Sequence, residues 1–142
     1  MTELYQNQLL IKAMAAWLTA QIIKTVIYAV VNGKVDMHRL FGDGGMPSGH
    51  SATVTALAVS AGMEYGFSSG VFAIAAVLAV IVMHDAMSVR LEAGKHAKAI
   101  NELLALMGSS EAPDIKLKEL LGHTPIQVCS GAVLGLLIAV LF

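Results

Sequence analysis

Four long apolar stretches, separated by polar connectors, constrain this chain more than any other feature of its sequence. Between residues 44 and 84 the only charged side chain is Glu64, and residues 125–142 carry none, whereas ten charged residues fall between Arg90 and Glu119. Only 13% of the 142 residues are charged, against about 25% in an ordinary soluble domain. A single small domain has nowhere to bury four such stretches, so a soluble helical protein is disfavoured and an integral membrane protein is predicted.

The apolar stretches predict about four membrane-spanning helices, at residues 9–31, 51–65, 71–87 and 125–142. Most of them are shorter than the roughly 20 residues that a helix needs to cross the hydrocarbon core. Either their polar ends extend them or the bilayer thins locally. We therefore expect an all-α, multi-pass transmembrane helical bundle, with the whole chain (1–142) as a single integral membrane domain.

The connector between the third and fourth spans carries a helical pattern of its own. Within residues 90–107, the side chains of Arg90, Gly94, Ala97 and Asn101 fall on one stripe, which predicts an amphipathic helix. Residues 108–114 have the composition of a loop. Residues 115–121 are predicted to form a short helix that leads back to the membrane.

Basic residues predict the orientation of the chain in a cell membrane. They gather in the connectors after the first and third spans, whereas the turn at residues 66–70 has none. The basic residues of these two connectors are Lys34, Arg39, Arg90, Lys95, Lys98, Lys116 and Lys118. This side is expected to be cytoplasmic, and three polar motifs at the ends of the spans should meet there.

The first motif, Gly-Gly-Met-Pro-Ser-Gly-His-Ser, occupies residues 44–51, directly before the second span. Ser48 is a good helix N-cap, and Gly49 leaves the backbone open. A helix N-terminus presents unpaired N–H groups and a partial positive charge, which suit a phosphate. His50 could donate a proton to a leaving oxygen. An ordinary capped helix after a glycine turn explains the same residues without a ligand.

The second motif, Gly-His-Thr-Pro-Ile-Gln, occupies residues 122–127, directly before the fourth span. Thr124 and Gln127 form a capping box around a proline that suits the first helical position. This capping explains those residues but not His123, which places a second imidazole beside a second helix N-terminus.

The third motif ends the third span and contains Asp85 and Arg90. Charges at the edge of a bilayer are costly unless they are paired or functional. Arg90 offers a planar fork for phosphate oxygens and Asp85 could orient a histidine, or the two could simply pair. Lys24, inside the first span, could face the same pocket or extend to the interface. No Cys and His residues have the spacing of a zinc site, so neither metal nor cofactor is expected.

Taken together, these motifs resemble the phosphatidic acid phosphatase type 2 superfamily, which also includes vanadium haloperoxidases. Pro-Ser-Gly-His at residues 47–50 is similar to its central motif, and Gly-His-Thr-Pro-Ile-Gln-Val at residues 122–128, followed by Gly131 and Gly135, is similar to its third motif. The whole set resembles the divergent branch of that superfamily and covers residues 21–138.

The resemblance implies a helical bundle that hydrolyses a phosphomonoester or pyrophosphate without a metal. Carried over by position, His123 is the nucleophile that forms a phosphohistidine, and His50 is the acid that protonates the leaving group. Ser48 and the Gly49 N–H would bind phosphate oxygens.

The chain departs from the superfamily pattern at three points. The usual Lys-x6-Arg-Pro motif is absent, and Lys24 and Arg39 do not have its spacing. Leu117 stands where an arginine is usual, so Arg90, Lys116 or Lys118 would have to supply that charge. Gln127 replaces the aspartate that orients the nucleophile, and a neutral amide can fix an imidazole tautomer but cannot stabilise an imidazolium.

Two main functions follow from these observations. The first is an integral membrane phosphatase acting on a lipid phosphate or pyrophosphate, and the second is a non-catalytic membrane protein that binds anionic lipid phosphate. A haloperoxidase is disfavoured because those enzymes take soluble substrates, and a transporter built on Lys24 and Asp85 would require an oligomer. The expected partners are membrane lipid and a phosphorylated lipid, a homo-oligomer stays open, and the net charge of -1 gives no attraction to nucleic acid.

Overall fold

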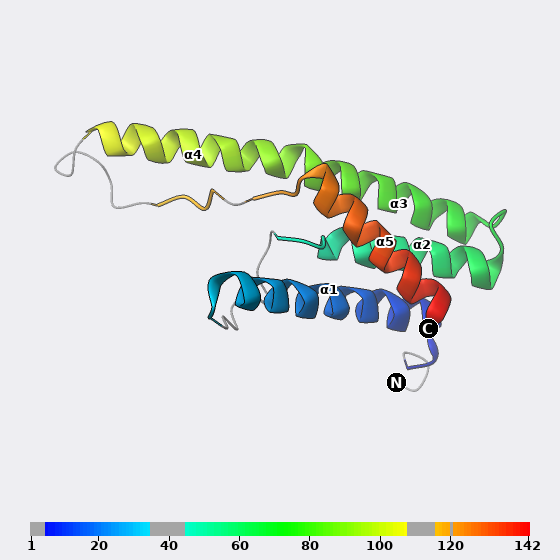
Figure 1. Ribbon diagram of the computed structural model, residues 1–142. Helices are drawn as coiled ribbons and strands as arrows, with labels where there is room; N and C mark the ends of the chain where they lie inside the picture. Colours follow the sequence, from blue (N-terminus) through cyan, green and yellow to red (C-terminus); the bar gives the residue numbers. More distant parts are fainter. Residues whose placement is uncertain (1–4, 35–44, 108–115, 120) are drawn as a thin grey trace.

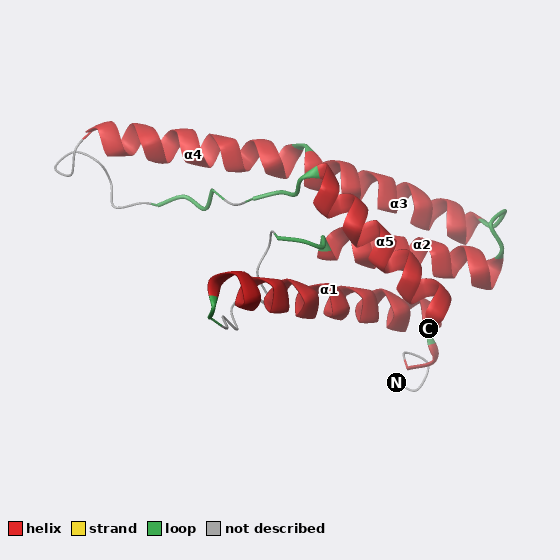
Figure 2. Cartoon of the chain, in the orientation of Figure 1, coloured by secondary structure: helices red, strands yellow, loops and turns green. Residues whose placement is uncertain are grey.

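The computed structural model describes residues 5–34, 45–107, 116–119 and 121–142. Its helices are α1 (Gln8–Asn32), α2 (Gly49–Tyr65), α3 (Gly70–Met87), α4 (Val89–Met107) and α5 (Pro125–Leu141). Four of them, α1, α2, α3 and α5, pack as a bundle, and α4 continues α3 beyond its end (Figure 1). Figure 2 shows the described chain as helices joined by loops, with no strand among those residues.

Side-chain caps place the start of each bundle helix. Asn7, Ser48, Ser69 and Thr124 each accept a hydrogen bond from the backbone N–H three residues later, which satisfies one of the donors that a helix start leaves without a partner. Gly33, with φ of 65°, ends α1 in the left-handed conformation. Because these residues are strong local signals, the predicted boundaries of all four apolar helices were right to within two residues.

Small side chains line the inside of the bundle. The central helix, α2, packs against α1, α3 and α5, and Ala16, Ala20, Ala52 and Ala56 form a buried cluster between α1 and α2. On α5, a Cβ at Gly131 would collide with the carbonyl oxygen of Ser48, and a Cβ at Gly135 with that of Ala52. The two backbones are therefore in direct contact, as in helix pairs joined by a small-xxx-small pattern.

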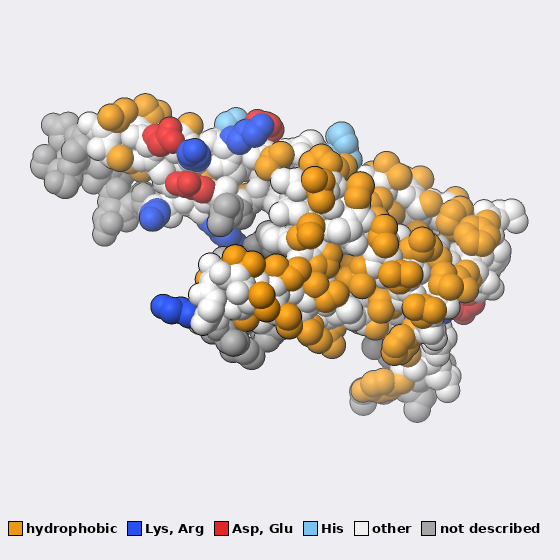
Figure 3. All heavy atoms as spheres, viewed as in Figure 1, with side chains coloured by type: hydrophobic (Ala, Val, Ile, Leu, Met, Phe, Trp, Pro, Cys, Tyr) orange, Lys and Arg blue, Asp and Glu red, His pale blue; other side chains and the backbone are white. Residues whose placement is uncertain are grey.

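Large apolar side chains cover the outside of the same helices. Ile74 is 74% exposed, Val80 65% and Val133 57%, and Figure 3 shows hydrophobic side chains over most of the visible bundle surface. Helices with small residues inside and bulky apolar residues outside are solvated by lipid rather than by water. By length and composition, α1 and the run Gly70–Leu106 suffice to cross a membrane. The predicted all-α membrane bundle is thus confirmed.

The polar motifs meet at one end of this bundle. The end of α1 and the start of α2 lie there, together with the end of α3 and the start of α5 (Figure 1). At the opposite end, Lys12 Nζ donates a hydrogen bond to the carbonyl oxygen of Ala139, 3.1 Å away, in the last turn of α5. Gly44 of the first motif, the basic connector residue Arg39 and the predicted loop at 108–114 lie outside the described residues.

Candidate active site

The imidazoles of His50 and His123 lie side by side where α2 and α5 begin. Their ring centroids are 5.8 Å apart and their planes are nearly perpendicular, at 81°. His50 stands in the first turn of α2 and is half-buried, whereas the His123 side chain, just before the cap of α5, is 2% exposed. Two residues 73 positions apart in the sequence therefore form one cluster, as the motifs predicted.

The main chain around His123 fixes its position from two sides. Its backbone N–H donates a hydrogen bond of 2.9 Å to the carbonyl oxygen of Ala86, near the end of α3. Gly122, with φ of 79°, packs so closely on the start of α4 that a Cβ there would collide with the backbone N of Leu91. Backbone contacts with α3 and α4 therefore fix the position of His123, in addition to its place directly before α5.

The buried ammonium group of Lys24 reaches the N-terminus of α2. Lys24 is 8% exposed, and its Nζ lies 3.7 Å from the position that a Cβ of Gly49 would occupy. The Trp17 indole borders the same position, with its Nε1 at 3.9 Å. A lysine ammonium beside the positive end of a helix dipole creates a site for a negatively charged group.

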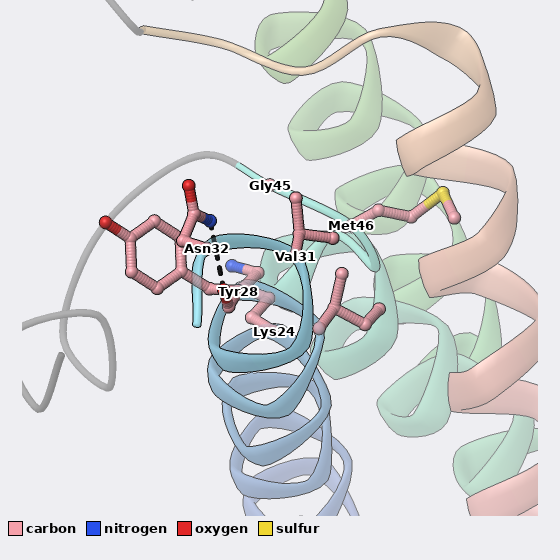
Figure 4. Close-up of a pocket in the computed structure, with 7 residues that line it drawn as sticks. Lys24, Tyr28, Val31, Asn32, Gly45 and Met46 are labelled. Atoms are coloured by element: carbon pink, nitrogen blue, oxygen red, sulfur yellow. Dashed lines mark hydrogen bonds between the residues drawn. The ribbon is translucent and has the colours of Figure 1, made fainter. Parts of the chain in front are cut away.

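Beside Lys24, a cavity of about 180 Å³ opens between the last turns of α1 and the loop before α2. Its walls are Ile27, Tyr28, Val31, Asn32, Gly45 and Met46. Figure 4 shows Lys24 within this group, and Asn32 Nδ2 donating to the Tyr28 carbonyl oxygen, 3.0 Å away. Most ligand pockets exceed about 300 Å³, so this cavity suits a part of a ligand next to its anionic group.

Ser48 joins the two helix starts. Its hydroxyl oxygen accepts from the Ser51 hydroxyl at 2.9 Å and from the Ser51 N–H at 3.3 Å, while its own N–H donates to the carbonyl oxygen of Gln127, 3.0 Å away on α5. Ser48 is fully buried. Any contact to a phosphate would therefore use its hydroxyl proton, and its predicted phosphate-binding role stays a prediction.

Gln127 caps the start of α5 through hydrogen bonds of both its side chain and its backbone. Its Oε1 accepts from the Thr124 N–H at 3.0 Å and its own N–H donates to the Thr124 hydroxyl at 3.4 Å, so the predicted capping box is confirmed. The carboxamide oxygen is thus engaged with the backbone of its own helix. The backbone carbonyl oxygen of Gln127 accepts the Ser48 N–H and so holds the start of α2 against α5, while the predicted support of His123 by Gln127 stays a prediction.

Asp85 and Arg90 form an ion pair at the junction of α3 and α4. Arg90 Nε lies 2.7 Å from Asp85 Oδ2, and the two side chains are 48% and 39% exposed. The structure thus confirms the pairing that the sequence left open. An exposed pair of this kind contributes little to stability, and Arg90 as a phosphate ligand stays a prediction.

The segment before His123 is extended, so the short helix predicted at residues 115–121 is wrong for the described residues 116–119. The Asn101 side chain of α4 donates to the carbonyl oxygen of Leu117 at 2.9 Å and accepts from its N–H at 3.0 Å. It also donates to Glu119 Oε1 at 2.8 Å. These bonds from Asn101 satisfy backbone groups of the segment that would otherwise bond within the predicted helix. Lys118 is an exposed residue of this segment, and its contact with a phosphate stays a prediction.

The pocket that the sequence suggested for Lys24 also includes Trp17 and Tyr28 of α1, which were not predicted. Trp17, Gln21, Lys24 and Tyr28 follow one another at intervals of four, three and four, which places them on one face of the helix. Polar and aromatic residues at this spacing, inside an otherwise apolar helix, are the signal that could have identified that face. Among the described residues, no three His, Cys, Asp or Glu side chains gather as a metal site would require.

The structure is that of a helical membrane bundle in which two histidines lie where α2 and α5 begin, with a buried lysine of α1 beside the start of α2. The chain belongs to the Divergent PAP2 family, which matches residues 5–138; PAP2 stands for phosphatidic acid phosphatase type 2. It is 43% identical over 148 residues to a Bacillus subtilis (strain 168) protein called "Uncharacterized membrane protein YuiD", covering 96% of this chain and 94% of that protein. No solved structure matches the chain.

Proposed function

We propose that this protein hydrolyses a lipid phosphate or pyrophosphate where the membrane meets water, through a phosphohistidine on His123. The observation that carries the proposal is the 5.8 Å separation of the His50 and His123 rings at a helix start that also holds the Lys24 ammonium. An acid and a nucleophile must both reach one phosphoryl group, and a cation must hold its oxygens.

The reaction proceeds in two balanced steps. A ring nitrogen of His123 attacks phosphorus, the bond between phosphorus and the leaving oxygen breaks, and protonated His50 gives its proton to that oxygen. Water then attacks the phosphohistidine while His50 accepts its proton, which releases inorganic phosphate and restores His123. Lys24 and the open N-terminus of α2 stabilise the charge on the phosphoryl oxygens during both steps.

The apolar surroundings favour a lipid as the substrate. The lining of the cavity beside Lys24 is largely apolar, with Ile27, Val31 and Met46 in its walls, and the outer face of α1 carries exposed residues such as Val26 and Val30. A phosphorylated lipid can keep its chain in the bilayer while its phosphate reaches Lys24. Basic residues in the connectors at this end favour the cytoplasmic side of the cell membrane.

A second candidate function is binding of anionic lipid phosphate without turnover. It is favoured by the Gln127 carboxamide, whose oxygen accepts the Thr124 N–H. An imidazolium that forms in the transition state would then lack the carboxylate that usually stabilises it.

One experiment separates the two functions. The purified protein, His50→Ala and His123→Ala are each reconstituted in vesicles with a panel of lipid phosphates and pyrophosphates, and inorganic phosphate release and vesicle binding are both measured. Hydrolysis that is lost in both variants and inhibited by vanadate supports the phosphatase. Binding without phosphate release from any lipid, unaltered in His123→Ala, overturns it in favour of the second function.

A further inference from the structure

The α4 helix extends outside the bundle and keeps the direction of α3. The helical hydrogen bonding continues through the junction, where the N–H of Ser88 donates to His84 O and that of Glu92 donates to Ser88 O, both at 2.9 Å. Figure 1 shows α4 passing beyond the ends of α1, α2 and α5. Its 19 residues make a rod of about 28 Å at 1.5 Å per residue.

Backbone contacts hold α4 in this direction. A Cβ on Gly94 would lie 2.5 Å from the carbonyl oxygen of Glu119, and one on Gly122 would collide with the backbone of Leu91. Asn101 adds two hydrogen bonds to the backbone of Leu117. Rotating α4 down onto a bilayer surface would break these contacts, so the helix projects as it stands.

One face of α4 carries an exposed row of residues at alternating intervals of four and three. The row, called here the α4 seam, consists of Val89, Ala93, His96, Ile100 and Leu103, and all five are exposed. Val89 is 65% exposed and Leu103 61%. A 4-3 spacing of mainly apolar residues is the pattern by which two helices pack along a common seam.

A lipid bilayer cannot cover most of this seam. The 18 residues of α3 span about 27 Å, close to the roughly 30 Å hydrocarbon core. Ile100 and Leu103 lie 13 and 16 residues after Met87, which adds about 20 and 24 Å along the same rod. When α3 crosses the membrane, the seam beyond Val89 lies outside the hydrocarbon core, and its exposed residues Ile100 and Leu103 need a protein surface.

We propose that the α4 seam packs against the same seam of a second copy of this chain, as a parallel two-helix contact. Both copies enter the membrane in one orientation, so their α4 helices run in the same direction and each seam residue meets its own counterpart. The proposal does not depend on the proposed enzymatic function.

The charges of α4 permit this pairing. Lys95, Lys98 and Glu102 lie away from the seam, and Glu92, which flanks it, is neutralised by Lys95 at 2.6 Å. From Val89 to Leu103 the seam spans 15 residues, or just over two heptads, which is short for a coiled coil in water. Confinement of both copies to one membrane raises their effective concentration. The seam contact should therefore form a stable dimer in the bilayer and dissociate in dilute detergent.

Cysteine crosslinking in membranes tests the proposal. In a Cys129→Ser background, which removes the natural exposed cysteine, Ile100→Cys and Leu103→Cys are compared with Lys98→Cys on the opposite face of α4. Facing Cα atoms of a seam are near the 4.4–6.8 Å that a disulfide requires. Mild oxidation should convert more than half of each seam variant to a disulfide dimer, at least fivefold more than Lys98→Cys.

The same experiment has clear contrary outcomes. Equal or absent dimer formation at all three positions overturns the proposal, as does crosslinking of the seam cysteines to a protein of another mass. Two seam positions are used so that loss of expression at one leaves the other decisive. Membrane levels of each variant, compared before oxidation, show that the fold is kept.

Discussion

Replacing Gly131 with alanine should force α2 and α5 apart where the two histidine-bearing helix starts meet. The new methyl group would collide with the carbonyl oxygen of Ser48 and lie 3.0 Å from the Cβ of Ser51. Neither backbone nor Cβ can rotate away. Because non-bonded atoms settle at about 3.5 Å or more, the helices must separate by roughly 1 Å.

Two magnitudes follow from that separation. Overpacking of a core contact costs about 1–3 kcal/mol, which for a chain of this length lowers the Tm by roughly 3–12 °C. A displacement of about 1 Å between catalytic groups lowers kcat on the order of a hundredfold. Gly70→Ala, at the start of α3, is the matched control, since nothing lies within 4 Å of its added Cβ.

Thermal unfolding in detergent and lipid phosphate hydrolysis below the Tm measure the two effects separately. We expect Gly131→Ala to lose both stability and turnover while Gly70→Ala keeps them. A Gly131→Ala protein with the Tm and activity of the control would refute the close packing of α2 on α5 that this reasoning requires.

Three further predictions concern single side chains. Lys24→Met should weaken binding to lipid phosphate vesicles by about ten- to a hundredfold, because a hydrogen bond to a charged group contributes roughly 1.5–3 kcal/mol. The control, Lys34→Met at an exposed lysine, should bind the vesicles normally. Equal affinities of the two variants would show that Lys24 does not belong to the site. Asn101→Ala should release the segment at residues 116–119 from α4, because the hydrogen bonds of Asn101 to Leu117 and Glu119 are lost. Added protease should then cleave this segment at least several-fold faster than in Lys98→Ala. Cleavage at an unchanged rate would show that Asn101 does not hold the segment. Thr124→Ala should cost about 1 kcal/mol through loss of the α5 cap, measured as a lower Tm, and Thr124→Ser should restore it; an unaltered Tm in Thr124→Ala would show that the capping box is energetically unimportant.

Local signals made the helices predictable. Ser48, Ser69 and Thr124 are strong caps, and the apolar runs that follow them have the length of helices, so type and boundary were both evident in the sequence. The convergence of His50 with His123 was also predictable, because alternating spans place every second helix end on one side. Pairing of Asp85 with Arg90 was one of two stated alternatives.

Nonlocal contacts account for what the sequence did not reveal. The Asn101 side chain satisfies the backbone of Leu117 sixteen residues away, and no local pattern distinguishes that arrangement from a short helix. The carbonyl group of Gln127 holds Ser48, a bond that every residue type can make and that therefore leaves no trace in the sequence. The cavity beside Lys24 depends on how α1 approaches the loop before α2.

Phosphate trapping on the protein tests the central claim most directly. The protein in vesicles is mixed with a lipid phosphate carrying a radioactive phosphoryl group, quenched in alkali, and digested to locate the label. We predict an acid-labile, alkali-stable phosphoryl group on His123, absent in His123→Ala. Label retained in His123→Ala, or rapid lipid phosphate hydrolysis with no phosphohistidine formed, would contradict the account.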